Sequence, residues 1–390
     1  MARDGDLRGR RPLRVGIVGA GNITVHGHVP AYQQLPDLFQ IVALADPTEE
    51  RLRAAGDLLE LAAADRHQDA ADLIARSDVD VVDVCTPQHL HHDLVIAAVE
   101  AGRHVLCEKP IAITPRDGAE MVAAARRAGV TFGVVHNYLF RPEVEAAVAE
   151  LRAGRIGRVE VAILNYLGVL DLPGAAAFRP SWRHDPRAAG GGVLMDMLHI
   201  VYVAEAILGT SFDRVSAHVT ARERGSGVED VALCRFEARD AVALVNVGWG
   251  LGPGGIEVSG SEGRLSIRFA GGATSPFAPV ESVTVVDRDG EHAVTVAAER
   301  TGLVELLADF AHAVLDGREP VGAGARALHA LESTLAAYAS GATGRMVELP
   351  LLPGDPMYEL GVMGVAELDL PAWSPVRTRG LFDSSAGGVR

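Results

Sequence analysis

Short apolar runs alternate with segments of helical periodicity over residues 13–136, and this alternation constrains the fold more than any other feature. It predicts a doubly wound parallel sheet, because each parallel strand needs a crossover helix to reach the next. Thr114 and Pro115 are a typical N-cap and first helical residue. The expected strands are Leu13–Val18, Ile41–Ala45, Val79–Cys85, His104–Cys107 and Val130–Val135, with helices at Glu49–Glu60, Leu90–Ala101 and Pro115–Ala128.

The pattern changes after residue 136, where strand-like stretches follow one another through short Gly/Asp turns. This favours a mainly antiparallel, open sheet with helices on one face. The fold class is therefore α/β, with a Rossmann-type domain followed by an α+β domain. Expected strands are Val159–Val169, Arg214–Ala221, Val231–Glu237, Ala241–Val247, Gly255–Ser259, Arg264–Phe269, Ser282–Asp287 and His292–Ala297, and expected helices are Pro142–Ala153, Val193–Leu208, Leu303–Leu315 and Ala325–Ser340.

The chain has 390 residues, more than one hydrophobic core usually serves, so two domains are expected. We place a disordered leader at 1–12, the first domain at 13–136, the second at 137–350 and a tail at 351–390. The tail is proline-rich and aperiodic. We expect it either to wrap a partner subunit or to end in disorder.

Composition excludes several classes of function. Lys and Arg number 36 and Asp and Glu 51, a net charge of −15 that repels phosphate backbones, so we expect no nucleic-acid partner. No apolar run approaches the roughly 18 residues of a membrane span, so no membrane role is expected. The three cysteines suit a reducing compartment, and the leader lacks the apolar region of a secretory signal. We therefore expect a cytoplasmic protein.

A glycine loop follows the first expected strand. In Val18-Gly19-Ala20-Gly21-Asn22-Ile23, Gly19 permits a tight turn and Gly21 lets the backbone approach a pyrophosphate. The helix that begins there would direct its amide groups at the phosphates. Thr24 stands where a third glycine is usual, which predicts slightly looser packing of helix on strand.

Asp46 ends the second expected strand, 22 residues after Thr24, where an acid binds the adenosine ribose hydroxyls. With the glycine loop and the strand order, it predicts dinucleotide binding. It favours NAD over NADP, because a 2′-phosphate at ~4 Å would meet repulsion on the order of several kcal/mol at an effective dielectric of ~20. Arg51 and Arg53 leave NADP open, since either could swing in to bind that phosphate.

Lys109 is the only lysine among the 36 basic residues, which leaves 36 − 1 = 35 arginines. It lies in Cys107-Glu108-Lys109-Pro110, directly after an expected strand. A compact ammonium is hard to replace with a guanidinium where its charge must act at one atom. We therefore interpret Lys109 as a chemical residue, although a stray lysine in an arginine-rich chain is the plain alternative.

Longer motifs make the chain similar to the Gfo/Idh/MocA family of sugar and polyol dehydrogenases over about residues 13–350. The motifs are Thr86-Pro87-Gln88-His89-Leu90-His91, Ala101-Gly102-Arg103-His104-Val105-Leu106-Cys107-Glu108-Lys109-Pro110, Gly190-Gly191-Gly192-Val193-Leu194-Met195-Asp196 and Ser259-Gly260-Ser261-Glu262-Gly263. The resemblance implies a Rossmann domain at 13–136 and a substrate-binding and oligomerisation domain at 137–350. It also implies a homodimer or homotetramer formed through the face of the second sheet.

The resemblance also implies the roles of individual residues at a cofactor site. The cofactor would be held by the glycine-loop residues and the ribose acid, which are Gly19, Gly21, Asn22, Ile23 and Asp46. It would also be held by residues at strand ends, by Glu108 on the nicotinamide side, and by a segment that closes over it. A cis Lys109–Pro110 bond is implied as well. The further cofactor residues are Thr86, Pro87, His91, Lys109, Asn137 and Arg183, the last next to Trp182.

For catalysis, the resemblance implies that Lys109 binds the reacting hydroxyl, His199 is the general acid/base and Asp196 orients the substrate or relays the proton. The reference pKa of histidine, about 6.5, suits that role at neutral pH. Here Asp196 and His199 are three residues apart, not four as is usual in the family. They can still share a helix face, or a distorted turn could restore the usual geometry.

Tyr138 is the remaining expected substrate contact, beside Lys109, Asp196 and His199. It lies in Asn137-Tyr138-Leu139-Phe140-Arg141-Pro142, where Leu139 replaces the usual arginine, which weakens any substrate assignment.

Neighbouring histidines invite a metal interpretation, but the spacing does not support one. His89, His91 and His92 do not all face one way at a helix start, and no cysteine or acid partner has a zinc spacing. Cys85 and Cys107 end expected strands and are read as buried small residues. We expect no metal.

The leading prediction is an NAD-dependent oxidoreductase acting on a secondary hydroxyl of a sugar, sugar derivative or cyclic polyol. One alternative is a glycoside hydrolase or lyase that uses tightly held NAD for transient oxidation. Another is a cofactor-binding regulator without catalysis. The sequence does not name the sugar or the direction of the reaction.

Overall fold

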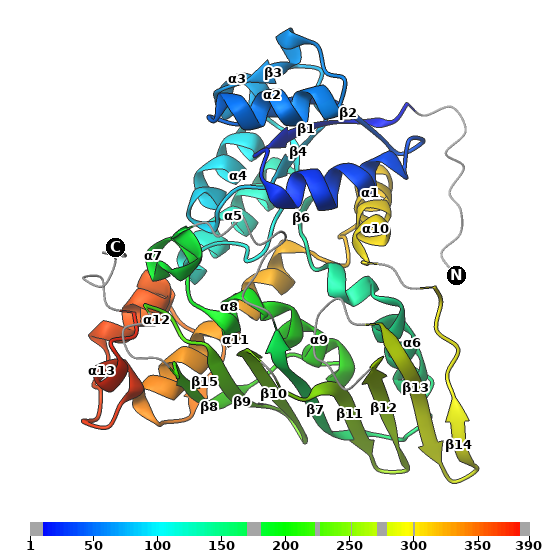
Figure 1. The fold of residues 1–390 in the computed structure, drawn as a ribbon, viewed down its shortest axis with the longest axis vertical. Helices are drawn as coiled ribbons and strands as arrows, with labels where there is room; N and C mark the ends of the chain where they lie inside the picture. The colour runs from blue at the N-terminus through cyan, green and yellow to red at the C-terminus, as the bar shows by residue number, and fades with distance from the viewer. Residues whose placement is uncertain are drawn as a thin grey trace.

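The computed structural model describes residues 11–169, 181–222, 227–250, 252–270, 279–298 and 301–382. They form two sheets with helices between and around them (Figure 1). The first sheet is wholly parallel with strand order β3-β2-β1-β4-β5-β6, which confirms the doubly wound prediction. Its strands are β1 Leu13–Val18, β2 Phe39–Ala45, β3 Arg66–His67, β4 Val81–Val84, β5 His104–Cys107 and β6 Phe132–Val134.

The helices around this sheet follow the predicted order. Thr114 caps the fifth helix by accepting the amide hydrogen of Asp117 at 3.0 Å, and Pro115 is its first residue, as expected. Two short elements, β3 and α3, escaped prediction because neither is long enough to show a period. The helices are α1 Val29–Gln33, α2 Glu49–Leu58, α3 Ala70–Ile74, α4 His91–Glu100 and α5 Pro115–Ala128.

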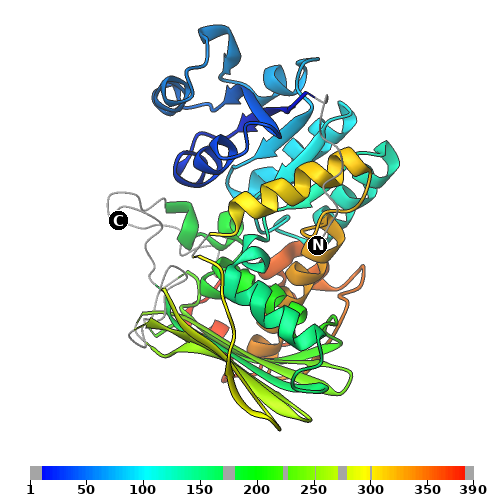
Figure 2. The same cartoon turned by 90° about the vertical axis from the view of Figure 1, so that its right-hand side faces the viewer.

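A helix from late in the chain completes the core of the first sheet. α10 (Leu303–Asp316) lies along that sheet in Figure 2, and its Leu307 and Phe310 belong to the same buried cluster as Val15 and Ile17. A Cβ on Gly133 would lie only 2.9 Å from the Phe310 ring, so the packing is close. The first core therefore draws on a helix that lies within our sequence-based second domain.

The second sheet has nine strands in the order β14-β13-β12-β11-β7-β10-β9-β8-β15. It is mainly antiparallel, as predicted, with one parallel pair, β7 and β10, at its centre. Its strands are β7 Val159–Val169, β8 Arg214–Thr220, β9 Val231–Ala238, β10 Ala241–Trp249, β11 Gly254–Gly260, β12 Gly263–Phe269, β13 Val280–Asp287, β14 Gly290–Ala293 and β15 Val347–Glu348.

Helices cover the face of this sheet that looks toward the first domain, while no described helix covers the opposite face (Figure 2). The covering helices are α6 Pro142–Arg152, α8 Val193–Asp196, α9 Leu198–Leu208 and α11 Gly324–Thr343, whereas the short α7 (Pro186–Ala189) packs on the 3-10 turns at Gln88–Leu90 and Gly361–Glu367. The single helix expected over Val193–Leu208 was wrong, because the backbone breaks at Met197 (φ −96°, ψ 26°).

No single described helix has the length and apolar content of a membrane span; one bent pair, Pro186–Asp196 with Leu198–Leu208, meets that test when joined.

Up to residue 382 the tail packs on its own chain. Residues 383–390, where disorder was one expectation, lie outside the described part, and the wrapping of a partner subunit remains a prediction. It contains α12 (Pro356–Leu360), a 3-10 turn at Gly361–Glu367 and α13 (Pro375–Arg379). Met357, Val362 and Val365 are fully buried. The apolar residues are too irregularly spaced to give a period, which is why the sequence suggested an open segment.

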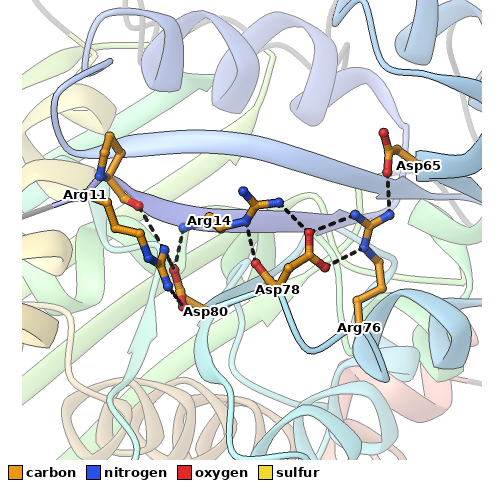
Figure 3. Close-up of polar contacts among 7 residues, drawn as sticks. Arg11, Arg14, Asp65, Arg76, Asp78 and Asp80 are labelled. Atoms are coloured by element: carbon orange, nitrogen blue, oxygen red, sulfur yellow. Dashed lines mark hydrogen bonds and ion pairs between the residues drawn. The ribbon is translucent and has the colours of Figure 1, made fainter.

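An arginine–aspartate network joins the starts of β1 and β4, at the edge of the first sheet opposite its carboxyl ends (Figure 3). Arg14 donates its amide hydrogen to Asp80 at 2.8 Å and its guanidinium to Asp78. Arg76 donates to both oxygens of Asp78 at 3.0 Å. Arg11 pairs with Asp80, so the described end of our expected disordered leader is held in place, while residues 1–10 lie outside the described part.

We predict that Asp78→Asn lowers the Tm at pH 7 by about 1–4 °C, as expected for a partly exposed network. Hydrogen bonds from Arg76 and Arg14 hold the pKa of Asp78 well below its usual range. The stability it contributes is therefore present above the unfolded-state pKa, about 3.9, and is lost as the pH falls below it. Urea unfolding between pH 7 and pH 3, with the exposed Asp37→Asn as control, should show the difference shrinking below pH 4; a constant difference would contradict this.

Candidate active site

The glycine loop leads from β1 into a helix at the carboxyl edge of the first sheet. Gly19 has φ +102°, and a Cβ there would lie 2.4 Å from the Cys85 carbonyl oxygen, so only glycine fits. Thr24 is fully buried and its hydroxyl donates to the Gly19 carbonyl at 2.7 Å. The residue in the place of the third glycine therefore fastens the turn by a hydrogen bond, and our expectation of looser packing at Thr24 is not what the structure shows.

Asp46 stands beside this loop at the end of β2, nearly buried. Its Oδ2 accepts the Ala20 amide hydrogen and its Oδ1 accepts that of Thr48, both at 2.8 Å. Each oxygen keeps a second lone pair for a ribose hydroxyl. The carboxylate thus shapes the loop and remains chemically suited to its predicted ligand.

A dinucleotide fits the residues around this loop. Thr86 Oγ1 and Gln88 Oε1 are buried and have no hydrogen-bond partner among the described residues, which is unusual unless a ligand satisfies them. A Cβ on Gly21 would meet nothing within 4 Å, so space is open where a pyrophosphate is expected. Asn22 and Ile23 form the first helical turn, and Ile23 is 44% exposed.

His91 does not face this space. It is fully buried, and its ring nitrogens lie 2.9 Å from the carbonyl oxygens of Thr86 and Pro110. The ring therefore braces the Thr86-Pro87 loop against the segment after Lys109, and the direct cofactor contact that we expected of His91 does not follow from its position. The Lys109–Pro110 peptide is cis, as expected.

Three of the predicted residues meet in one ionic cluster between the domains. The Lys109 ammonium donates to the Asp196 carbonyl oxygen at 2.8 Å and lies 3.6 Å from its carboxylate. Arg183 donates to both carboxylate oxygens, at 2.9 and 3.3 Å. Burial alone would raise the pKa of Asp196, but the charges of Lys109 and Arg183 lower it below its usual value, so the carboxylate stays ionised. A small cavity opens here, lined by Gln88, Trp182, Arg183, Gly191, Asp196 and Trp249.

The turn that carries Asp196 is held from behind by a buried carboxylate. Glu229 accepts the amide hydrogens of Gly192 and Leu194 at 2.9 and 2.8 Å and the hydroxyl hydrogen of Tyr338 at 2.7 Å. The glycines leave room for this contact, because a Cβ on Gly192 would lie 2.1 Å from the Glu229 carbonyl oxygen and one on Gly191 2.3 Å from the Tyr338 oxygen. Glu229 therefore serves as the N-terminal cap of α8.

His199 lies in a stack of rings on the other side of the break at Met197. Its ring stacks on Tyr138 with centroids 4.1 Å apart, and its Nδ1 lies 2.6 Å from the Tyr202 hydroxyl. The Arg141 guanidinium lies over the Tyr138 ring, 5.2 Å from its centroid. Burial, and next the charge of Lys109, lower the pKa of His199 well below its usual value. The ring is therefore neutral, and our argument from a reference pKa near 6.5 was wrong for this residue.

Asn137 points away from this stack. Its side-chain amide donates to the Thr301 carbonyl oxygen at 3.0 Å, at the start of α10. The break at Met197 is the distorted turn that the three-residue spacing of Asp196 and His199 allowed as one possibility. The structure thus brings together Lys109, Asp196 and Arg183 in one cluster, and Tyr138 and His199 in the next.

Two sequence profiles match the chain. One, described as an oxidoreductase family with an NAD-binding Rossmann fold, matches residues 13–136, and the other, the GFO/IDH/MocA C-terminal domain, matches residues 144–266. The chain belongs to the GFO/IDH/MocA oxidoreductase family.

Relatives in this family align over most of the chain. D-apiose dehydrogenase of Paraburkholderia graminis is 28% identical over an alignment of 367 residues, and the match covers 87% of this chain and 90% of that protein. The 1,5-anhydro-D-fructose reductase of Ensifer adhaerens is 31% identical over an alignment of 289 residues, and the match covers 71% of this chain and 82% of that protein. A levoglucosan dehydrogenase solved with NADH and levoglucosan superposes with a TM-score of 0.75 at 25% identity, covering 87% of this chain and all of that one.

The sequence did not reveal the buried residues that fix the backbone around the GFO/IDH/MocA site. Glu229 lies in a strand-flanking Val228-Glu229-Asp230 segment that reads as a turn, and Tyr338 lies in an apolar helix. His28 and Tyr32 share a helix face four residues apart, a spacing that could have drawn attention to them.

We predict that Glu229→Gln changes how stability depends on pH. Burial raises the pKa of Glu229 to about 7, from a usual value of 4.5, although Tyr338 and the α8 amides oppose the shift. The folded state then holds a proton that the unfolded state releases, so wild-type stability falls as the pH rises between these values. Relative to wild type, the variant should gain roughly 1.4 kcal/mol per pH unit over that window and nothing above it.

Urea unfolding from pH 4.5 to pH 8 measures this difference, with the exposed Glu291→Gln as the matched control. A difference between Glu229→Gln and wild type that is independent of pH would show that Glu229 is ionised throughout.

Proposed function

We propose that the protein is an NAD-dependent dehydrogenase that moves a hydride between a secondary hydroxyl of a sugar, sugar derivative or cyclic polyol and the nicotinamide. The observation that carries this proposal is the Lys109 ammonium, held 2.8 Å from the Asp196 carbonyl oxygen between the two domains. A positive charge fixed there stabilises the alkoxide that forms as a hydroxyl loses its proton. NAD supplies the hydride acceptor when bound.

The chain's own residues then divide the work between them. Lys109 binds the reacting hydroxyl, and Asp196, ionised and aligned by Arg183, accepts hydrogen bonds from neighbouring substrate hydroxyls. Trp182 and Trp249 line the same small cavity and offer apolar surface to the C–H groups of a sugar ring. Sugar relatives such as D-apiose dehydrogenase support this substrate class.

His199 is proposed as the general acid/base. The Tyr202 oxygen accepts the Tyr138 amide hydrogen at 3.2 Å and has a second lone pair for an Nδ1–H of His199. That tautomer leaves the Nε2 lone pair available for the substrate's proton. Because the ring is neutral, it is in the form that a base requires before the proton is taken up.

Asp46 supports NAD rather than NADP as the cofactor. Its carboxylate is fixed by two backbone amides, so it does not turn away from a 2′-phosphate without breaking both hydrogen bonds. The repulsion that favoured NAD in the sequence therefore acts from a fixed position. The neighbouring structure with NADH supports the same choice.

We also propose that the uncovered face of the second sheet joins copies of the chain into a homodimer or homotetramer. Leu233 and Val161 expose 41% and 36% of their surface on this face, and Leu244 and Asn246 line a shallow hollow beside Leu233. Exposed apolar side chains on one uncovered sheet face are typical of an interface. A cytoplasmic location remains a prediction of the sequence.

We predict that absorbance at the NADH band rises when the protein is mixed with NAD and one class among inositols, hexoses, hexuronates and glycosides. Lys109→Ala should lower kcat by at least about 100-fold, because it removes the charge beside the alkoxide. NADP should be more than tenfold poorer than NAD. Arg127→Ala, an exposed cation on α5, is the matched control and should leave the rate unchanged.

An active Lys109→Ala variant would contradict the assigned role. NADH that fails to appear, while NAD is released on denaturing the protein, would favour the transient-oxidation alternative. Absence of both would count against the dehydrogenase.

We predict that Leu233→Arg reduces the assembly toward a monomer, because a buried, unpaired guanidinium opposes association. Light scattering after gel filtration gives the mass of wild type and variant. Leu352→Arg, which changes a 65% exposed side chain in the tail, is the control and should keep the wild-type mass. A wild type that is monomeric, or a variant with unchanged mass, would exclude this face as the interface.

A further inference from the structure

A buried group of polar side chains lies next to Glu108, and none of the proposed catalytic steps uses it. The chain makes a π-helical turn at Thr24–His28, directly after the glycine loop, and His28 ends that turn fully buried. Its Nδ1 lies 2.7 Å from Asp83 Oδ2 and its Nε2 3.0 Å from Glu108 Oε1. Tyr32 donates its hydroxyl hydrogen to the same Asp83 oxygen at 3.0 Å.

Hydrogen-bond chemistry determines how many protons this group holds. A neutral imidazole has one N–H and one bare nitrogen, whereas ionised carboxylates only accept. Both ring nitrogens of His28 face a carboxylate oxygen, so each contact needs a proton and the group must hold one more than the neutral ring brings. With that proton on the ring, His28 is an imidazolium between two carboxylates, and the three groups together carry a charge of −1.

A metal ion would not fit these contacts as they stand. His28, Asp83 and Cys85 offer three ligand atoms close together, with Cys85 Sγ 3.4 Å from His28 Nδ1. Two ligands about 2.0 Å from a tetrahedral zinc stand roughly 3.3 Å apart. The 2.7 Å between His28 Nδ1 and Asp83 Oδ2 is a hydrogen-bond distance, so a proton occupies the contact.

The His28 ring connects three segments whose relative positions must be fixed in the proposed dehydrogenase. His28 belongs to the helix that follows the glycine loop, Asp83 to the central strand β4, and Glu108 precedes Lys109. The second Glu108 oxygen accepts the Lys109 amide hydrogen at 3.0 Å. Any movement of the Glu108 carboxylate therefore moves the backbone that carries the Lys109 ammonium.

We propose that His28, held as an imidazolium between Asp83 and Glu108, is a positioning residue that fixes the Glu108 carboxylate and the Lys109 backbone at the nicotinamide end of the cleft. This inference rests on the proposed function for the identity of that end. His28 touches neither cofactor nor substrate in this role and acts through Glu108.

The charges that face His28 agree with this geometry. Burial alone would lower the pKa of His28, but Asp83 raises it well above its usual value. Burial would raise the pKa of Glu108, but His28 and Lys109 lower it below its usual value. Burial raises the pKa of the Cys85 thiol to about 12, so that neighbour is uncharged.

The first test reads the protonation of the ring in the wild type and needs no substrate. In ¹⁵N spectra of histidine-labelled protein at pH 8, we expect a ring with both nitrogens protonated whose signal is absent in His28→Gln. His329, paired with Glu205, has its pKa raised to about 9 and is also protonated at pH 8, but its signal should persist in His28→Gln, which separates the two. A His28 ring with one bare nitrogen at pH 8 overturns the proposal, as does a metal ion retained by the purified protein at this site.

The second test compares NADH with ADP-ribose, which lacks the nicotinamide. His28→Gln donates to one carboxylate only and leaves the other buried without its charge partner. We expect it to weaken NADH binding about tenfold and ADP-ribose binding less than twofold, since only the nicotinamide end is disturbed. His26→Gln, an exposed residue in the same helical turn, should bind both ligands like wild type.

A double variant distinguishes positioning from packing. His28→Gln/Asp83→Asn returns the group to a charge of −1, so it should recover most of the NADH affinity, a non-additive effect expected of interacting residues. Equal weakening of NADH and ADP-ribose, or additive effects of the two substitutions, would assign His28 a structural role only and overturn the proposal. If the wild type binds neither ligand, the proposed function fails, whereas the ¹⁵N result still decides the state of His28.

Discussion

The hydrogen bond from the Lys109 ammonium to the Asp196 carbonyl oxygen is the contact on which the site depends, because it joins the two domains at the place where chemistry is proposed. Lys109 follows β5 of the first sheet, and Asp196 ends α8 above the second. The bond requires both β5 and the α8 turn to be in place at once. A flexible side chain of high rotamer entropy makes this bond only where its partners are fixed beforehand.

That requirement explains why a buried carboxylate fixes the backbone at both Lys109 and Asp196. Glu108 holds the Lys109 amide, and Glu229 holds the amides that begin α8. A buried carboxylate is costly unless donors surround it, so each one enforces the geometry of its donors. For Glu108 the donors include the His28 ring, and for Glu229 they include the Tyr338 hydroxyl. The rigidity of the site thus comes from polar groups that do not face the substrate.

Much of the fold followed from pattern alone, and the exceptions have physical causes. The strands β1, β5 and β7 begin and end where the sequence predicted, because apolar runs bounded by Gly, Asp or Pro are unambiguous. The break at Met197 was not predictable, since Val193–Leu208 is apolar apart from Asp196, His199 and Glu205, and periodicity does not reveal a change of axis in a buried segment. α10 was expected as a helix, but its place on the first sheet depends on contacts that no local pattern encodes.

The site residues likewise fall into a group that the sequence could predict and a group that it could not. Motif residues such as Gly19, Asp46 and Lys109 could be named because their chemistry requires a residue type at a position. Asp83 and Glu229 could not, because a buried charged residue is recognisable only by the partners that neutralise it, and these come from distant segments. For His28 the four-residue spacing from Tyr32 was the one local signal. The neutral state of His199 escaped for the same reason, since burial and the charge of Lys109 override its intrinsic pKa.

The tail after residue 350 lies outside the family resemblance, yet it also helps to hold the α8 turn in place. The Tyr338 hydroxyl donates to Glu229 and accepts the Met195 amide hydrogen, so both of its hydrogen-bonding functions serve the α8 turn. Polar contacts at one atom do not fix the plane of the ring, which must be set by packing. Phe382 meets that ring edge-on at 5.3 Å, and its own amide donates to the Gly227 carbonyl oxygen, close to Glu229 in the chain. The described end of the chain therefore closes the packing behind the turn that presents Asp196 to Lys109.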